Sequence, residues 1–118
     1  MRLAGVHHVS LNVRNIDEAA TFYLDVLGLE VLPRPDLGFA GLWLGSGSQQ
    51  IHLMEVKDHD ASESQHFAFR VDDLDGALAE LRARGVHVSR VLDVSDVCRQ
   101  AFFRDPSGNL IELNEPRS

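Results

Sequence analysis

Four side chains of types that bind divalent metal ions stand at matching places in two similar halves of this chain. His8 and His66 are each the second residue of a seven-residue stretch, HHVSLNV and QHFAFRV, and they lie 58 residues apart. His52 and Glu112 are each the sixth residue of a second pair of stretches, GSQQIHL and SGNLIEL. Three imidazoles and one carboxylate form a suitable ligand set for a borderline cation: Zn²⁺, Ni²⁺, Co²⁺, Mn²⁺ or Fe²⁺. The first hypothesis is therefore a single divalent metal ion held by these four residues.

The similarity of the two halves extends beyond these stretches. Asp17 and Ala19 recur as Asp75 and Ala77, again 58 residues later. We interpret the chain as two copies of one unit of about sixty residues. The first unit is expected at about residues 5–56 and the second at about 65–115, joined by the polar linker 57–64, and together they are expected to form a single domain, 1–118.

Hydrophobic periodicity predicts the same order of elements, βαβββ, in each unit, and hence an α+β fold of two such modules. In the first unit the pattern predicts strands at 5–13, 29–32, 39–44 and 49–56, with a helix from a cap at Asn15 or Asp17 to Leu27 and a tight turn at 45–48. In the second unit it predicts strands at 65–71, 86–91, 97–104 and 110–114, with a helix from a cap at Asp72 or Asp73 to about Arg84 and a turn at 105–108.

The alternation of side chains along a strand puts the four candidate ligands on one kind of surface. His8 alternates with Val9 and Leu11, and Glu112 alternates with Ile111 and Leu113, so the candidates point away from the apolar face that a helix covers. Two such sheets facing one another would form a cup with a mixed lining, a typical site for a small ligand. Further residues are expected to contact substrate in this cup: Ser10, Trp43, Met54, Arg70, Gln100 and Phe102.

Composition narrows the class of partner. The net charge of the 118 residues is −7 and no cluster of lysine and arginine is present, which argues against nucleic acid and anionic membranes. No apolar run approaches the length of a membrane-spanning helix. Cys98 is the single cysteine, which excludes an internal disulfide and fits a cytoplasmic protein.

The chain resembles the vicinal oxygen chelate superfamily, which includes glyoxalase I, bleomycin resistance proteins and extradiol dioxygenases. The resemblance is carried by HHVSLNVRNIDEAATFYLDVLGLEV, QQIHLMEV, QHFAFRVDDLDGALAELRARGV and RDPSGNLIELNEP. It implies the glyoxalase/bleomycin resistance/dihydroxybiphenyl dioxygenase-like fold, in which paired βαβββ modules form a cupped mixed sheet. It also implies metal ligands at His8, His52, His66 and Glu112. Bacterial glyoxalase I is expected to have a glutamate in place of His52, whereas fosfomycin-modifying thiol transferases use only the other three ligands.

What the resemblance implies about activity leaves several classes open. The leading expectation is a metal-dependent isomerase or lyase acting on a small substrate with neighbouring oxygens, with Glu112 as the candidate catalytic base. A fosfomycin-type thiol transferase and an extradiol-type dioxygenase are alternatives within the same ligand set. A metal-free protein that sequesters a ligand, of the bleomycin-resistance type, is the non-enzyme alternative. A homodimer is also expected, with each metal site formed either within one chain or between two.

Overall fold

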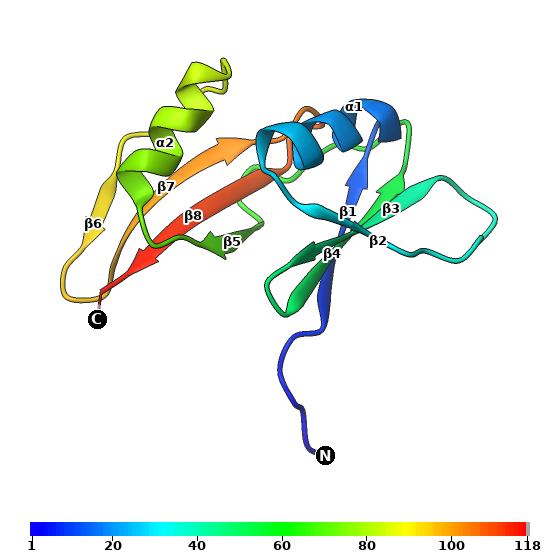
Figure 1. Cartoon of the computed structure of the whole chain (residues 1–118), viewed down its shortest axis with the longest axis horizontal. Helices are drawn as coiled ribbons and strands as arrows, with labels where there is room; N and C mark the ends of the chain where they lie inside the picture. The colour runs from blue at the N-terminus through cyan, green and yellow to red at the C-terminus, as the bar shows by residue number, and fades with distance from the viewer. Residues whose placement is uncertain (118) are drawn as a thin grey trace. The chain divides into compact units, whose positions relative to one another are not determined.

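The computed structural model describes residues 1–117, which divide into two compact units, Met1–His59 and Asp60–Ser118 (Figure 1). The boundary between the units falls inside the polar segment 57–64 that the sequence predicts as a linker. Each unit is a four-stranded mixed sheet with one helical segment, and each is described below by itself.

Unit 1 has the predicted βαβββ order. Its strands are β1 (His8–Val13), β2 (Glu30–Leu32), β3 (Gly41–Ser46) and β4 (Gln49–Glu55), and its helical segment is α1 (Ile16–Ala20) followed by the π-helical turn η1 (Thr21–Val26). The strand order is β1-β4-β3-β2. β1 is parallel to β4, because the chain crosses over through the helical segment between β1 and the meander of β2, β3 and β4.

Unit 2 repeats this topology. Its strands are β5 (His66–Arg70), β6 (Leu92–Val94), β7 (Cys98–Arg104) and β8 (Leu110–Pro116), and its helix is α2 (Leu74–Ala83). The strand order is β5-β8-β7-β6, with β5 parallel to β8. The predicted α+β pair of βαβββ modules is therefore the observed secondary structure.

Each helical segment begins at a side-chain cap. Asn15 accepts a hydrogen bond from the Glu18 amide at 2.9 Å, and Asp73 accepts one from the Gly76 amide at 3.0 Å, so one of each pair of predicted caps is confirmed. A carboxylate from the last strand of the same unit also accepts an amide hydrogen bond there. Glu55 Oε2 lies 3.0 Å from the Ile16 nitrogen, and Glu115 Oε2 lies 2.8 Å from the Leu74 nitrogen.

The core of each unit lies between the sheet and its own helical segment. In unit 1 the buried apolar side chains are Val13, Ala19, Phe22, Tyr23, Leu44, Ile51 and Leu53. In unit 2 they are Leu74, Leu78, Leu81, Cys98, Ala101, Phe103, Ile111 and Leu113. Apart from Cys98, the strand residues in these sets are those that alternation predicts for the helix-covered face.

The predicted strand at 86–91 is wrong. The structure has β6 at Leu92–Val94 instead, and only an isolated bridge joins Val88 to Phe103. The two pairings differ by one residue in register, since Leu92 pairs with Gln100. The hydroxyl of Ser89 accepts the Phe102 amide at 2.9 Å, a place that a strand carbonyl would otherwise take, so the ladder is interrupted there.

Two smaller expectations need correction. The single predicted α-helix to Leu27 changes to π-type pairing after Ala20, where the Leu27 amide bonds the Phe22 carbonyl at 3.0 Å. The predicted turn at 45–48 is shorter, because Gly45 and Ser46 belong to β3. Gly28 ends the helical segment with φ +73°, as a left-handed C-terminal glycine does.

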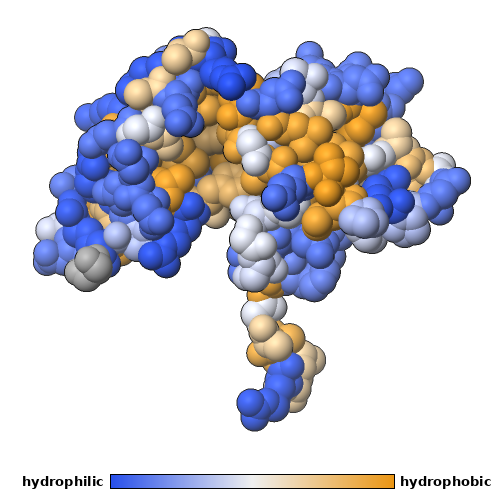
Figure 2. All heavy atoms as spheres, in the orientation of Figure 1, coloured by the Kyte–Doolittle hydropathy of each residue, from blue (hydrophilic) through white to orange (hydrophobic). Residues whose placement is uncertain are grey.

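Some apolar surface of unit 1 is not covered. Figure 2 shows apolar side chains between α1 and β2. Val31, on β2, is 56% exposed. The segment before β1 extends away from the sheet of unit 1, and it carries the exposed side chains of Leu3 and Val6 (Figures 1 and 2). Within residues 1–117, none of the helices is long and apolar enough to span a membrane.

Candidate metal centre

In unit 2 the candidate ligands His66 and Glu112 contact each other directly. His66 lies on β5 and Glu112 on the adjacent parallel strand β8, and Nε2 of the imidazole is 3.2 Å from Oε1 of the carboxylate. Glu112 is only 7% exposed, so this carboxylate is held within the protein. The other ring nitrogen of His66, Nδ1, is 2.8 Å from the Ser64 carbonyl. If Nδ1 carries the proton and donates it there, the lone pair of Nε2 faces Glu112.

The second oxygen of Glu112 is also engaged. Asn114 Nδ2 donates to Glu112 Oε2 at 2.8 Å and lies 3.4 Å from the sulfur of Cys98. The thiol of Cys98 is in turn 3.7 Å from Gln100 Oε1. Glu112 therefore sits at the end of a short hydrogen-bonded series on one face of the sheet.

In unit 1 the candidate ligands His8 and His52 are stacked instead. Their ring centroids are 4.0 Å apart with an angle of 17° between planes, and Trp43 stacks on the other face of His52 at 4.4 Å and 8°. His52 Nε2 is 2.8 Å from Gln50 Oε1. His8 Nδ1 shares a hydrogen bond of 2.9 Å with His7 Nδ1. His52 is thus the middle ring of a three-ring stack and is 8% exposed.

The two pairs differ in how well they fit a metal ion. Ligand atoms about 2.1 Å from one ion, at angles between octahedral and tetrahedral, are separated by roughly 3.0–3.4 Å. The 3.2 Å between His66 Nε2 and Glu112 Oε1 matches that separation. The lone pair of an imidazole lies in its ring plane, and the nearly parallel planes of His8 and His52 do not converge on one nearby point. The pair in unit 2 thus has the separation of two ligands of one ion, whereas in unit 1 one ring would have to turn for both to face the same ion.

Burial lowers the pKa of the His52 imidazole, and electrostatic interactions with His8, His7 and Arg34 lower it further. His52 is therefore neutral at neutral pH. A neutral imidazole keeps one ring nitrogen available as a metal ligand or as a hydrogen-bond acceptor.

The substrate-contact candidates of unit 1 lie close to His52. Ser10 is directly opposite His52 in the pairing of β1 with β4, and Trp43 is opposite it in the pairing of β3 with β4. Met54 is the next residue of β4 on the same face, opposite Gly41. The structure therefore brings Ser10, Trp43 and Met54 to one surface of unit 1.

The candidates of unit 2 are less uniform. Phe102 is opposite Glu112 in the pairing of β7 with β8, and its ring meets the His66 ring edge to face at 5.2 Å. Gln100 is opposite Asn114 and completes the series described above. Arg70 shares the face, but its side chain is 76% exposed and its nearest acidic partner is Asp72 at 3.9 Å. Phe102 and Gln100 thus flank the ligand pair, and Arg70 extends into solvent.

Two other arginines are committed elsewhere. Arg99 bonds Asp75 at 2.9 Å and Glu115 at 3.4 Å on the helix-covered face of unit 2. Arg104 donates to backbone carbonyls at Glu63 and Gly108. These contacts give both arginine side chains a structural role within unit 2.

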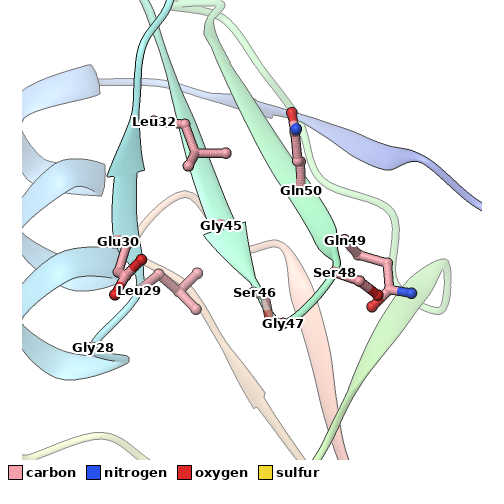
Figure 3. A pocket seen from close by; sticks show the side chains of 10 residues that line it. All are labelled: Gly28, Leu29, Glu30, Leu32, Gly45, Ser46, Gly47, Ser48, Gln49 and Gln50. Atoms are coloured by element: carbon pink, nitrogen blue, oxygen red, sulfur yellow. The ribbon is translucent and has the colours of Figure 1, made fainter.

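A groove of about 570 Å³ lies at the turn end of unit 1, beside β2 and the adjoining ends of β3 and β4 (Figure 3). Its lining is Gly28, Leu29, Glu30, Leu32, Gly45, Ser46, Gly47, Ser48, Gln49 and Gln50. None of the predicted site residues lines it. Gln50 connects it to the ring stack, because the same side chain bonds His52.

Sequence reasoning misses three residues that bond the candidate ligands: His7, Gln50 and Asn114. Gln50 and Asn114 each lie two residues from a candidate ligand on the same strand, so alternation alone puts them on the ligand face. That signal was sufficient to find them, although it gives no distance. Across the part of the chain that the structure describes, no group of three or more His, Cys, Asp or Glu side chains is close enough to hold a metal ion.

The chain is similar in sequence and in fold to known proteins. Residues 5–113 match the family described as the Glyoxalase/Bleomycin resistance protein/Dioxygenase superfamily. A lactoylglutathione lyase of Haemophilus influenzae is 32% identical over 94% of this chain and 92% of its own. A solved putative glyoxalase family protein from Bacillus anthracis is 28% identical, with a TM-score of 0.89 over 99% of this chain and 100% of its own. The antibiotic binding protein TnmS3 from a Streptomyces species is 29% identical, with a TM-score of 0.84 over 99% of both chains.

Proposed function

Because this chain belongs to the Glyoxalase/Bleomycin resistance protein/Dioxygenase superfamily, we propose that it is a divalent-metal-dependent enzyme similar to glyoxalase I. The ligands of the one metal ion are His8, His52, His66 and Glu112. The ion is Ni²⁺, Zn²⁺, Co²⁺, Mn²⁺ or Fe²⁺, and the substrate is a small molecule with neighbouring oxygens. The reaction is of the isomerase or lyase type.

The observation that carries this proposal is the contact of His66 with Glu112. A ring nitrogen and a buried carboxylate oxygen stand 3.2 Å apart, the separation that two ligands of one ion adopt. The equivalent places in unit 1 hold two more imidazoles, His8 and His52. The lactoylglutathione lyase relationship supports the reaction class.

When bound, the metal would polarise two neighbouring substrate oxygens as a Lewis acid. Glu112 is the base of the proposed reaction, and because it is also a proposed ligand, its carboxylate must loosen from that role before it accepts the proton from the carbon next to a substrate carbonyl. Trp43 and Phe102, each opposite a candidate ligand on the neighbouring strand, pack against the substrate and exclude water. Because His52 is neutral, the site carries one more positive charge than it would with a second carboxylate, which favours an anionic substrate.

Metal content of the purified protein tests this proposal. The protein is prepared without chelator or nickel affinity steps, beside a His66→Ala/Glu112→Ala variant and a Glu115→Gln control on the opposite face of β8. We expect about one metal ion per chain in the wild type and the control, and none in the double variant. A wild type that carries no metal, and takes up none on dialysis against the five cations, would refute the proposed enzyme.

The second candidate is a metal-free protein that sequesters a ligand. The similarity to the antibiotic binding protein TnmS3 and the stack of Trp43, His52 and His8 favour it, because flat rings bind flat ligands by stacking. A metal-free wild type would make it the leading proposal. A bound Fe²⁺ would instead favour an extradiol-type dioxygenase, and Mn²⁺ together with thiol transfer to a phosphonate would favour a fosfomycin-type transferase.

The proposal includes a homodimer, since exposed strand edges and exposed apolar side chains such as Val31 need cover. Sedimentation equilibrium tests it. The dimer predicts twice the chain mass of 13.1 kDa, and a monomer at micromolar concentration would contradict it.

A further inference from the structure

We propose that Asn114 is a positioning residue that holds Glu112 as a one-oxygen metal ligand, and that Cys98 anchors Asn114 in this role. The inference rests on the proposed metal site. It adds to that site two residues that do not touch the metal themselves. It also states which carboxylate oxygen of Glu112 is the ligand.

The contacts of the Asn114 amide carry the argument. Its nitrogen Nδ2 has two hydrogens. One is donated to Glu112 Oε2 at 2.8 Å, and the other faces the sulfur of Cys98 at 3.4 Å. Glu112 is 7% exposed and Cys98 is 5% exposed, so water competes little for either acceptor. The amide is therefore held at both hydrogens, and if it turns away from Glu112 this half-buried donor loses its carboxylate partner.

The consequence for Glu112 is that its two oxygens are no longer equivalent. Oε2 accepts the Asn114 amide, and Oε1 faces His66 Nε2 at 3.2 Å. A carboxylate held in this way offers a metal ion one oxygen. Without the amide, the carboxylate could rotate about its last side-chain bond and offer both oxygens to the ion.

Cys98 is the proposed anchor of the Asn114 amide. It lies on β7, 16 residues before Asn114, and its thiol is 3.7 Å from Gln100 Oε1. A buried thiol is a weak donor and a weak acceptor, so it can accept from Asn114 and donate to Gln100 at the same time. Cys98 is the single cysteine of the chain, and this role for it requires no disulfide.

The side chain at the position of Asn114 differs between the two units, although their topology is the same. The register position equivalent to Asn114 is Met54. Met54 is opposite Asn12 and Gly41. Asn114 is opposite Arg70 and Gln100. A thioether has no hydrogen to donate. At this register position, an amide donor is present in unit 2, whose last strand carries the carboxylate, and a thioether is present in unit 1.

Cobalt titration of the full chain tests the inference. The variants are Asn114→Leu, which keeps the shape without the donor, and Asn114→Ala, in case the first does not fold. Glu115→Gln on the opposite face of β8 is the control for loss of stability. Losing a partner of a metal ligand typically weakens metal binding by about 10–100-fold, and we expect this for both Asn114 variants. We also expect their Co²⁺ absorption bands to weaken and shift, because a two-oxygen carboxylate raises the coordination number.

A pair of Cys98 variants tests the anchor. Cys98→Ser keeps an acceptor for the amide and is expected to bind Co²⁺ like the wild type. Cys98→Ala removes it and is expected to weaken binding by less than the Asn114 variants do. Equal affinities and unchanged spectra in the Asn114 variants, beside a wild type whose binding is lost in His66→Ala, would overturn this inference alone. A wild type that binds no Co²⁺ would overturn both this inference and the proposed function.

A gain-of-function design gives a second test. Glutamate at position 52 would stand two residues before Met54, as Glu112 stands two before Asn114. If the amide orients the carboxylate, His52→Glu/Met54→Asn should bind Co²⁺ at least as tightly as His52→Glu alone, with a sharper change in the Co²⁺ spectrum. Weaker binding by the double variant would count against the inference.

Discussion

Unit 1 and unit 2 have the same strand order and the same register, but their candidate ligands are arranged in different ways. In each unit the second ligand lies two residues beyond the partner of the first, since His8 pairs with Gln50 and His66 pairs with Leu110. In unit 2 this spacing brings a ring nitrogen and a carboxylate oxygen together. In unit 1 the same spacing stacks two rings face to face. The backbone register sets the positions of the Cα atoms of each pair. The side-chain types and rotamers then decide whether two ligand atoms face each other.

On the helix-covered faces of the two sheets, both the register and the side-chain types are repeated. Glu55 and Glu115 occupy equivalent places on the last strands, and each accepts an amide hydrogen bond at the start of its own helical segment. The helix-covered faces of the units are alike and serve stability. The opposite faces, which carry the candidate ligands, differ between the units.

Gly41 and Gln100 give the largest expected difference in stability between the units. They occupy the same register position, opposite Met54 and Asn114. A Cβ on Gly41 would lie 2.5 Å from the Leu53 carbonyl oxygen and 2.8 Å from Arg34 Nη2, so the backbone must shift. We expect Gly41→Ala to lower the free energy of unfolding in urea by about 1–3 kcal/mol. Gln100→Ala is expected to cost less, and equal costs would show that the two positions are equally open.

The carboxylates Glu55 and Glu115 should give smaller and similar effects. Losing a cap at a helix start typically costs about 0.5–2 kcal/mol, and we expect this range for Glu55→Ala and Glu115→Ala. Glu115 also bonds Arg99 at 3.4 Å, so its removal should cost slightly more. Thermal unfolding of both variants, followed by circular dichroism, checks this order. No loss in either variant would mean that Asn15 and Asp73 suffice as caps.

The smallest expected effect concerns a pair present in unit 2 alone. The hydrogen bond and charge of Arg99 hold the pKa of Asp75 below its ordinary value of 3.8. Its contribution to stability is complete above that value and is lost as pH falls through the folded-state pKa. Asp75→Asn should therefore be less stable than the wild type at pH 7, with the difference vanishing in strong acid.

The equivalent residue of unit 1 provides the control for this pH dependence. Among residues 1–117, Asp17 takes part in no ion pair. Because Asp17→Asn removes no ion pair, it should cost less stability at pH 7 than Asp75→Asn does. A difference for Asp75→Asn that persists in acid would mean that the Arg99 pair is not its source.

Much of the fold could be predicted from the sequence because its causes are local. Alternation of polar and apolar residues specified the strands that hold all four candidate ligands, and Gly28 marked a helix end. The strand predicted at 86–91 failed because the Ser89 hydroxyl competes with the backbone for the Phe102 amide. No local pattern reports such a contact across 13 residues.

The candidate site could be predicted in part for the same reason. Parity placed His66 and Glu112 on one face, and their contact follows from the parallel register. Parity could not show that His8 and His52 stack, because that depends on side-chain rotation. It also could not show that Asn114 bonds Glu112 rather than solvent. These features are set by packing between strands that are distant in sequence.

The most direct test is a Co²⁺ titration of the metal-free protein and four single variants: His8→Ala, His52→Ala, His66→Ala and Glu112→Ala. If unit 2 supplies the preformed half of the site, His66→Ala and Glu112→Ala should each weaken binding by more than about 100-fold, beyond the effect of losing an outer partner. His52→Ala should weaken it least, because the His52 ring is held by Trp43 and Gln50. A loss in His52→Ala as large as that in Glu112→Ala would contradict the account.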